Sequence, residues 1–389
     1  MKFRGFAAAF LLFSIAALSL IPSAIPGISS REITIGMTLG LSGKYHEMAD
    51  MVMKGARLWE KETNRSGGIL GKKVRLLIYD DKSNPENART LYERLIEKDK
   101  VDLVFGPYSS ELKEAILPIT EKHGYPVLTA SPADSLWDKG YKYLFGISMP
   151  AQNISAGFLE MLARNDIGSI AVVCANDATS RSIASGVKTW AGRFGQKVLL
   201  FEEYNDGKGL EEAVKKAKAS RAQALIFCGY FDDSVTARRV QKKLGWSPRA
   251  FFAPIGPALG AFHAVLREDA DFVFSSSTWE HHGGLMAPGC MEFHNAFLRE
   301  YREEPSYHAA EAYAMGQLLQ TAIKDARSFD REKIRDTLSL MDAMSILGRY
   351  GVDTRGMQLK HFNLVIQWQN GRREVVWPKE LGTAKPVFQ

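Results

Sequence analysis

Val101-Asp-Leu-Val-Phe-Gly-Pro-Tyr-Ser-Ser110 and, one βα unit later, Pro126-Val-Leu-Thr-Ala-Ser-Pro-Ala-Asp-Ser135 are the two stretches that decide the fold class. Each is a short apolar run that ends in small hydroxyl residues, and such runs are typical of parallel strands buried on both faces. A helix-compatible stretch over residues 111–122 follows the first run. The pattern predicts parallel βα units whose strand ends and helix N-termini gather at one edge of a sheet.

Hydroxyl residues at such an edge can form a site for an anion. Tyr108, Ser109, Ser110 and Ser135 lie at the ends of the two runs. Ligands of open α/β sheets bind at the carboxyl edge of the strands, and a helix N-terminus with serine hydroxyls favours a carboxylate. The alternative is that these serines only cap helices, which is a routine role for serine. Two such loops in adjacent units favour a binding site.

The alternation of short apolar runs and amphipathic stretches occurs twice along the chain. One series of strands is predicted over residues 33–147 and a second over residues 169–276. Helices such as 85–98, with proline at its first position, lie between the strands. The pattern breaks near residues 147–153 and 277–284, where we expect the chain to cross between lobes. The prediction is an α/β protein with two Rossmann-like lobes, each with a parallel-sheet core, joined by a multi-strand hinge.

The lobes are expected to be discontinuous in sequence. We assign residues 31–148 and 280–350 to lobe 1, and residues 149–279 and 351–389 to lobe 2. A lobe built from separate segments can open and close about a hinge. Helices are predicted at 289–301, 308–326 and 330–341, and strands at 360–369 and 374–377.

The first 30 residues predict a secretory signal. Lys2 and Arg4 precede an apolar stretch over residues 6–20, and small, proline-bearing residues 21–30 follow. The apolar stretch is short for a membrane span, although an uncleaved anchor is the alternative. We therefore expect residues 1–30 to be removed and the protein to be located in the periplasm.

Composition argues against several other classes of protein. The 389 residues carry a formal charge of +6 without a polybasic tract interleaved with aromatics, so no nucleic-acid partner is expected. The three cysteines, Cys174, Cys228 and Cys290, are too few for a disulfide scaffold and follow no metal-ligand spacing. His281 and His282 are adjacent but lack an evident third ligand. Neither a cofactor nor a metal is expected.

Catalytic motifs are incomplete. In Gly40-Leu-Ser-Gly-Lys44, a phosphate loop would need glycine where Thr38 stands and a hydroxyl residue where Tyr45 stands. His46-Glu47 has Asp50 where a zinc protease needs its second histidine, and the chain has no G-x-S-x-G elbow. The sequence therefore predicts that the protein is not an enzyme.

A longer segment carries a resemblance to a known family. Asn64-Arg-Ser-Gly-Gly-Ile-Leu-Gly-Lys-Lys-Val-Arg-Leu-Leu-Ile-Tyr-Asp-Asp81, with Gly55-Ala-Arg57 before it and Asn84-Pro85 after it, resembles the first lobe of type I periplasmic binding proteins. More narrowly, the chain resembles the branched-chain amino-acid and amide binding family, including Leu/Ile/Val-binding proteins, that serves ABC importers. The resemblance runs from about Arg31 to Trp368. The glycines of the GGI-x-G motif permit a turn between helix and strand.

The resemblance implies where a ligand would bind. Members that bind amino acids hold the carboxylate through a serine that matches Ser110 and a hydroxyl residue that matches Ser135, with backbone groups near Ala133 and Asp134. The opposite lobe contributes an aromatic residue that matches Tyr230. Phe231 lies beside it. The alternative for Tyr230 is a core tyrosine at a strand end.

Several positions depart from the family pattern. Family members that bind amino acids have an acidic residue that contacts the α-amino group, and this chain has Ile255 at that position. A buried ammonium without a carboxylate partner would be costly. Either Asp134 supplies that charge, or the ligand has no ammonium. Two pocket tyrosines of amino-acid binders align with Ser180 and Met48, while Trp137 could offer an indole wall or pack within lobe 1. The candidate ligand-binding residues are therefore Met48, Tyr108, Ser109, Ser110, Ala133, Asp134, Ser135, Trp137, Ser180, Tyr230, Phe231 and Ile255.

These expectations combine into one hypothesis. We expect a monomeric extracytoplasmic solute-binding protein of an ABC importer, which closes around a small carboxylate-bearing solute and delivers it to a membrane permease. The solute could be an organic acid, an aromatic acid or an amino acid, and the loss of the acid at Ile255 favours a carboxylate without an α-amino group. The alternative is a ligand-sensing receptor subunit that signals to a membrane partner.

Overall fold

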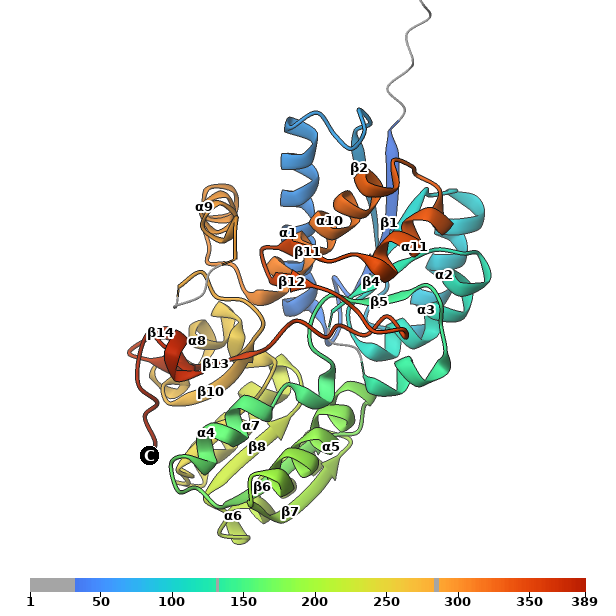
Figure 1. Ribbon diagram of the computed structural model, residues 1–389. Coiled ribbons are helices and arrows are strands. Elements are labelled where there is room, and N and C mark those ends of the chain that lie inside the picture. The colour runs from blue at the N-terminus through green and yellow to red at the C-terminus, as the bar shows by residue number, and fades with distance from the viewer. Residues whose placement is uncertain (1–31, 131–132, 283–286) are drawn as a thin grey trace, which may run out of the picture.

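Two sheets divide the chain into two lobes (Figure 1). The computed structural model describes residues 32–130, 133–282 and 287–389, so the predicted signal segment lies outside the described residues. The lobe 1 sheet has the order β2-β1-β3-β4-β5 and all its neighbouring strands are parallel. Its strands are β1 (Ile33–Leu39), β2 (Val74–Asp80), β3 (Leu103–Phe105), β4 (Val127–Thr129) and β5 (Leu144–Gly146).

The lobe 2 sheet has the order β14-β13-β10-β9-β8-β6-β7. Its last two strands in sequence pair antiparallel at one edge, and the other five are parallel. In both lobes the strand order reverses beside the first strand, and such switch points create a crevice at the carboxyl ends of the strands. The strands are β6 (Ser169–Ala175), β7 (Lys197–Tyr204), β8 (Ala224–Cys228), β9 (Ala250–Phe252), β10 (Val273–Ser277), β13 (Leu364–Gln369) and β14 (Arg372–Trp377).

Helices flank both sheets, and their starts follow local sequence signals. The Asn84 side chain accepts hydrogen bonds from the N–H groups of Glu86 and Asn87 at the start of α2, where Pro85 is the first residue. The helices of lobe 1 are α1 (His46–Arg65), α2 (Pro85–Glu93), a π-helical continuation (Arg94–Lys98), α3 (Ser110–Lys122), α9 (Cys290–Tyr301), α10 (Tyr307–Ala326) and α11 (Arg331–Leu340). Those of lobe 2 are α4 (Ala156–Ala163), α5 (Ala178–Arg193), α6 (Gly207–Ala219), α7 (Phe231–Lys243) and α8 (Gly260–Leu266).

The remaining elements are short. They are the hairpin β11 (Ala343–Ser345) and β12 (Gly348–Tyr350), and the 3-10 turns Asp134–Lys139, Ala151–Asn153, Gly256–Ala258, Arg267–Ala270 and Lys379–Leu381.

Two glycines let α10, which comes from the C-terminal part of the chain, dock on α1 (Figure 1). A Cβ atom at Gly55 would lie 2.0 Å from the carbonyl oxygen of Ala309, and one at Gly316 would lie 2.1 Å from the Trp59 ring. Any larger residue would push the two helices apart. This contact completes lobe 1 with a segment distant in sequence.

The predicted glycine turn between α1 and β2 is confirmed. Gly67, Gly68 and Gly71 have φ values of 94°, 82° and 79°, a region that other residues adopt at a cost. A Cβ at Gly68 would also lie 2.0 Å from the carbonyl oxygen of Lys72.

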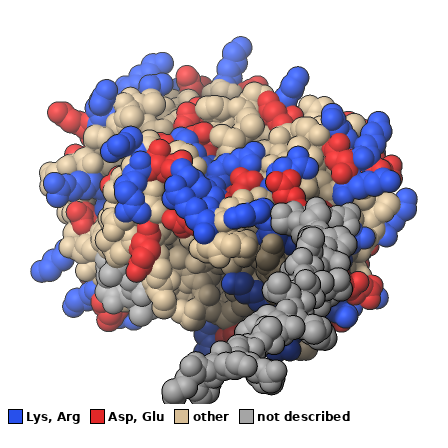
Figure 2. Space-filling view, turned by 90° about the horizontal axis from the view of Figure 1, so that it is seen from above, with Lys and Arg blue, Asp and Glu red and all other residues tan. Residues whose placement is uncertain are grey.

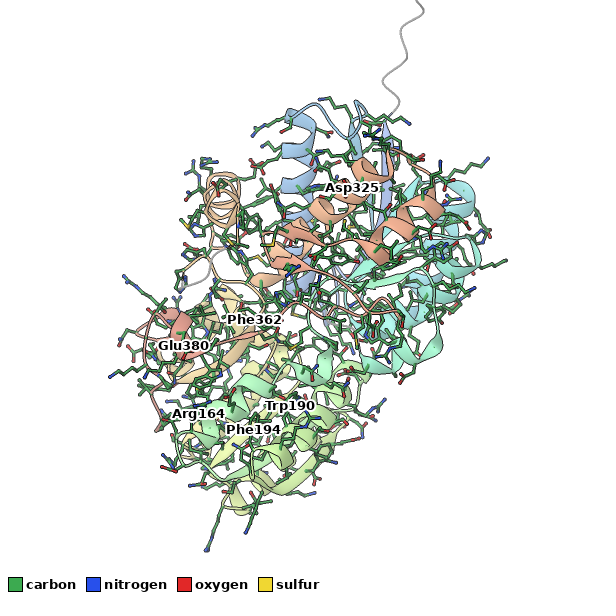
Figure 3. All side chains as sticks on the ribbon, viewed as in Figure 1. Arg164, Trp190, Phe194, Asp325, Phe362 and Glu380 are labelled. Carbon is green, nitrogen blue, oxygen red and sulfur yellow. The ribbon has the colours of Figure 1, made fainter. Side chains whose placement is uncertain are left out.

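The chain crosses between the lobes after β5, after β10 and after β12. Figure 3 shows Phe362 between the two lobes on the third crossing, whereas Trp190 and Phe194 stack on α5 in the body of lobe 2 with ring centroids 5.9 Å apart. The N–H of Gly146 donates to the carbonyl oxygen of Gly356 at 2.8 Å, so the chain still contacts β5 at that point. The lobe boundaries given above therefore remain a proposal.

The surface is of mixed charge on the face seen in Figure 2, where Lys and Arg side chains alternate with Asp and Glu side chains. No continuous basic area covers the described residues on that face. Among the residues that the structure describes, no helix combines the length and the hydrophobicity needed to cross a membrane.

Candidate ligand site between the lobes

A cavity of about 60 Å³ lies where the carboxyl ends of both sheets meet. Loops that follow β3 and β4 supply its lobe 1 side, together with α3 and α10, and the starts of α5 and α7 supply its lobe 2 side. This is the position that the two switch points create. The lining residues are Val52, Gly106, Pro107, Tyr108, Ser109, Ser110, Lys113, Thr129, Ala130, Ile154, Thr179, Tyr230, Ile255, Tyr307, His308, Glu311, Ala312 and Met315.

The N-terminus of α3 points at this cavity through two serines. Ser109 has φ 70° and ψ 151°, a conformation that residues other than glycine rarely adopt, and its hydroxyl accepts a hydrogen bond from the N–H of Leu112 at 3.4 Å. The Ser110 hydroxyl accepts from the N–H of Ala133 and from the Thr179 hydroxyl, both at 2.8 Å. Because these donors occupy both lone pairs, the Ser110 proton is left to donate to an anion.

Tyr108 and Tyr230 form an aromatic wall of the cavity from both lobes, and the Tyr45 ring packs against both of them without lining the cavity. Tyr45 and Tyr108 come from lobe 1, and Tyr230 comes from lobe 2. The Tyr230 ring packs edge-on against Tyr45 at 4.9 Å and against Tyr108 at 6.3 Å between centroids. Burial raises the pKa of the Tyr230 phenol well above its ordinary value, so the wall stays neutral. An apolar ligand body can pack against the Tyr108 and Tyr230 rings.

A buried pair of opposite charges, Lys113 and Glu311, lies on the lobe 1 side of the cavity, and each residue is only 5% exposed. The Lys113 Nζ donates to the carbonyl oxygen of Ala130 at 2.7 Å, and Glu311 Oε1 accepts from the Thr278 hydroxyl at 3.0 Å. Burial lowers the pKa of Lys113 to about 8 and raises the pKa of Glu311 to about 7. The attraction between the two charges opposes both shifts.

His308 is a neutral member of the same face of α10. Its Nε2 lies 3.1 Å from the Tyr108 hydroxyl, and its Nδ1 lies 3.4 Å from the Ser306 hydroxyl. Burial lowers the pKa of His308 to about 3. The ring therefore orients Tyr108 without adding charge to the cavity.

Comparison with protein families decides the identity of this two-lobed architecture. Residues 32–373 match the family described as periplasmic binding protein. The chain belongs to the periplasmic binding protein family. This is a family of solute-binding proteins without enzymatic activity, as the incomplete catalytic motifs predicted.

Relatives and solved structures of this family cover nearly all of the chain. The Leu/Ile/Val-binding protein homolog 7 of Brucella suis is 25% identical over 395 residues, which span 94% of this chain and 96% of that protein. The branched-chain amino acid transporter substrate binding protein of Streptococcus pneumoniae, solved with isoleucine, superposes with a TM-score of 0.81 at 22% identity, covering 92% of this chain and all (100%) of that one. A solute binding protein of an ABC transporter from R. palustris, solved with benzoate, gives a TM-score of 0.78 at 17% identity, covering 92% and 99%. These similarities confirm the predicted fold of the periplasmic binding proteins.

Five of the candidate residues predicted from the sequence line the cavity. They are Tyr108, Ser109, Ser110, Tyr230 and Ile255. Ala133 lies just behind them and contributes its N–H to Ser110.

Asp134 lies away from the cavity and joins the lobes instead. Its carboxylate accepts from the Ser182 hydroxyl at 2.6 Å and from the N–H of Gln152 at 3.0 Å, and both partners belong to lobe 2. The structure therefore does not place this carboxylate where a ligand ammonium would lie in the cavity.

The other candidates lie outside the cavity lining. The Ser180 hydroxyl donates to the Asp177 carboxylate at 2.8 Å within the cap of α5, and Ser135 is exposed. Met48 and Trp137 are buried in the core of lobe 1, and Phe231 is buried at the start of α7. That any of these residues contacts the ligand stays a prediction, and their positions outside the cavity lining do not favour it.

Sequence reasoning missed Lys113, Glu311 and Thr179. Lys113 interrupts the buried stripe of α3 that continues through Ile116 and Leu117, and Glu311 is an isolated acid in the Ala-rich first half of α10. A charge on an otherwise apolar helix face is the signal that could have found the first two.

Proposed function

We propose that this protein is the solute-binding subunit of an ABC importer, located in the periplasm, which closes around a small carboxylate-bearing solute and delivers it to a membrane permease. The observation that carries the proposal is the pair Ser109 and Ser110 at the start of α3, facing Thr179 and Tyr230 of the other lobe. N–H groups and hydroxyls at a helix N-terminus favour a carboxylate. The two ligand-bound neighbours support this class, because isoleucine and benzoate both carry a carboxylate.

Among carboxylates, we favour one without an α-amino group and with an aromatic or aliphatic body. Ile255 lines the cavity where the resemblance places the acid that binds an ammonium. Glu311 already accepts a hydrogen bond from Thr278 and interacts with the charge of Lys113. A ligand ammonium would have to compete with Lys113 for this carboxylate, whereas a ligand carboxylate would gain from the lysine.

A ligand screen on refolded protein tests the proposal. The mature, untagged chain is unfolded and refolded to remove any solute acquired during expression, and its thermal unfolding is followed with benzoate, isoleucine, succinate and benzamide. A ligand at 100 times its dissociation constant stabilises the native state by about 2.7 kcal/mol, which shifts the melting temperature measurably. We expect benzoate to stabilise more than isoleucine and much more than the neutral benzamide.

Two outcomes would contradict the proposal. One is that no carboxylate raises the melting temperature while a neutral solute does. The other is that the bound solute is recovered chemically altered, since a binding protein returns its ligand unchanged. Uptake into membrane vesicles that contain the cognate permease separates transport from sensing, because only an importer accumulates the solute.

A further inference from the structure

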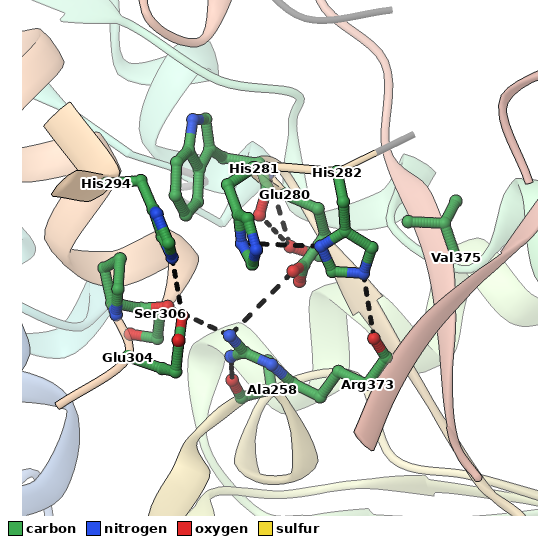
Figure 4. Close-up of polar contacts among 12 residues, drawn as sticks. Ala258, Glu280, His281, His282, His294, Glu304, Ser306, Arg373 and Val375 are labelled. Carbon is green, nitrogen blue, oxygen red and sulfur yellow. Dashed lines mark hydrogen bonds and ion pairs between the residues drawn. The ribbon is translucent and has the colours of Figure 1, made fainter. Parts of the chain in front are cut away.

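The crossing from β10 to α9 carries a cluster of histidines and acids outside the ligand cavity (Figure 4). The sequence showed His281 and His282 without an evident third ligand. In the folded chain, ligand atoms of Glu280, His281 and His282 lie within 4.8 Å of one another. On the other side of His281, a second group with His294 and Glu304 lies within the same limit.

The two adjacent imidazoles face each other through their Nδ1 atoms, which are 3.4 Å apart. Nitrogen ligands of a tetrahedral zinc ion with bonds of 2.0–2.1 Å lie about 3.3 Å apart, so this spacing needs almost no rearrangement. His282 Nε2 lies 2.9 Å from the carbonyl oxygen of Arg373. That contact holds the proton on Nε2 and leaves the Nδ1 lone pair directed at His281, which is how outer contacts prepare a metal-binding histidine.

Glu280 supplies an independent reason to expect a cation. Its side chain is 1% exposed, and neither carboxylate oxygen has a hydrogen-bond partner among the described residues. The Arg373 guanidinium forms a long ion pair with Glu280 at 3.9 Å, beyond hydrogen-bond distance, and donates its hydrogen bonds to the carbonyl oxygens of Ala258 and Pro305 instead. A buried carboxylate without hydrogen bonds is costly unless a cation binds it.

We propose that Glu280, His281 and His282 bind one divalent transition-metal ion of the zinc class, with water in the fourth position. Two imidazoles and one carboxylate are a ligand set that zinc accepts. A cavity of about 410 Å³, lined by His281, His282 and Glu304, opens this side of the cluster to solvent and provides a path for the ion.

His294 and Glu304 position the imidazole of His281. The His294 ring stacks on the His281 ring with centroids 3.8 Å apart, and His294 Nε2 lies 2.8 Å from Glu304 Oε2. These contacts fix the plane of His281 from the α9 side, while His282 is tied to β14 through Arg373. An ion at Glu280 would therefore clamp one crossing between the lobes to the elements on both sides of it.

Metal analysis of the full mature chain tests this assignment without any solute present, so its failure is distinguishable from failure of the proposed function. Untagged protein is treated with chelator, titrated with ZnCl₂ by calorimetry, desalted and analysed for bound metal. We expect one zinc per chain, and CoCl₂ should give the visible absorption of tetrahedral cobalt. Glu280→Gln and His282→Asn should each weaken zinc binding by more than about tenfold, since they remove direct ligands.

Two further variants serve as comparisons. His46→Asn changes a histidine whose side chain is 58% exposed on α1 and should leave zinc binding unchanged. His294→Asn should weaken zinc less than either ligand variant. Wild-type protein that retains no zinc after desalting would overturn the proposal, as would zinc that persists in Glu280→Gln and His282→Asn but is lost in His294→Asn.

Discussion

Replacing Ser110 with alanine removes one hydroxyl from the cavity. The structure predicts separately how much this substitution lowers ligand affinity and how much it lowers folding stability. The hydroxyl accepts from Ala133 and Thr179 and keeps its proton for a ligand. A hydrogen bond to a charged group contributes about 1.5–3 kcal/mol. Ser110→Ala should therefore weaken a carboxylate ligand by roughly tenfold to a hundredfold.

The same substitution should also lower folding stability. The N–H of Ala133 loses its buried acceptor in both the free and the bound protein, which costs about 1–3 kcal/mol of unfolding free energy. Because this loss is common to both states, it largely cancels from the binding free energy. Calorimetric titration and urea unfolding on the same preparation then measure the two effects separately.

Ser180→Ala is the matched control. Ser180 is as buried as Ser110 and also lies in the first turn of a helix, but its hydroxyl donates to Asp177 and does not line the cavity. It should lose stability while it keeps wild-type affinity. Wild-type affinity in Ser110→Ala would show that this serine is only a cap, and an equal loss of affinity in Ser180→Ala would show that the geometric assignment is wrong.

Three further changes test other parts of the site. Glu311→Gln should leave the affinity for benzoate unchanged or raise it, because the substitution removes a charge of the same sign as the ligand's. Lys113→Met should weaken benzoate binding by at least tenfold, roughly the effect of losing a hydrogen bond to a charged group. Calorimetry that showed no benzoate binding by Glu311→Gln would contradict the first expectation. Asp134→Asn should weaken the binding of all ligands to a similar extent and enlarge the ligand-free particle in small-angle scattering, because the Asp134 carboxylate joins the two lobes. A loss of isoleucine binding alone would instead indicate that Asp134 binds the ammonium of an amino acid. Burial lowers the pKa of His308 from 6.5 to about 3, so the unfolded chain takes up a proton first and the unfolding free energy should fall by about 1.6 kcal/mol between pH 6.5 and 5. Urea unfolding of His308→Gln should show a shallower fall, and an unchanged pH dependence would refute the assignment.

The strands of both sheets could be predicted because their apolar runs are continuous and separated by regular helices. Residues 33–39 and 74–80 are strands within the first predicted series, and residues 169–175 and 224–228 are strands within the second. The β11–β12 hairpin was not predicted.

The site was predictable where the topology alone determines it. Ser109 and Ser110 follow a strand end, and parallel strands bring such ends to one edge, whereas the resemblance to a known family indicated Tyr230. Lys113 and Glu311 line the same cavity from α3 and α10, and α10 reaches lobe 1 by docking on α1 through Gly55 and Gly316, a packing detail that no local pattern contains. The contacts of Asp134 could not be predicted for a similar reason, because its partners Gln152 and Ser182 belong to the other lobe.

The hydrogen bond between Ser110 and Thr179 has a kinetic consequence. The free proton of the Ser110 hydroxyl lies in a cavity that both lobes line, so a solute can reach it only after the Ser110–Thr179 and Asp134–Ser182 bonds between the lobes have broken. The opening of the lobes therefore sets an upper limit on the speed of capture, and the observed association rate should level off as the solute becomes concentrated. At low solute concentration the rate of capture is proportional to that concentration, and at high concentration the opening of the lobes limits the rate.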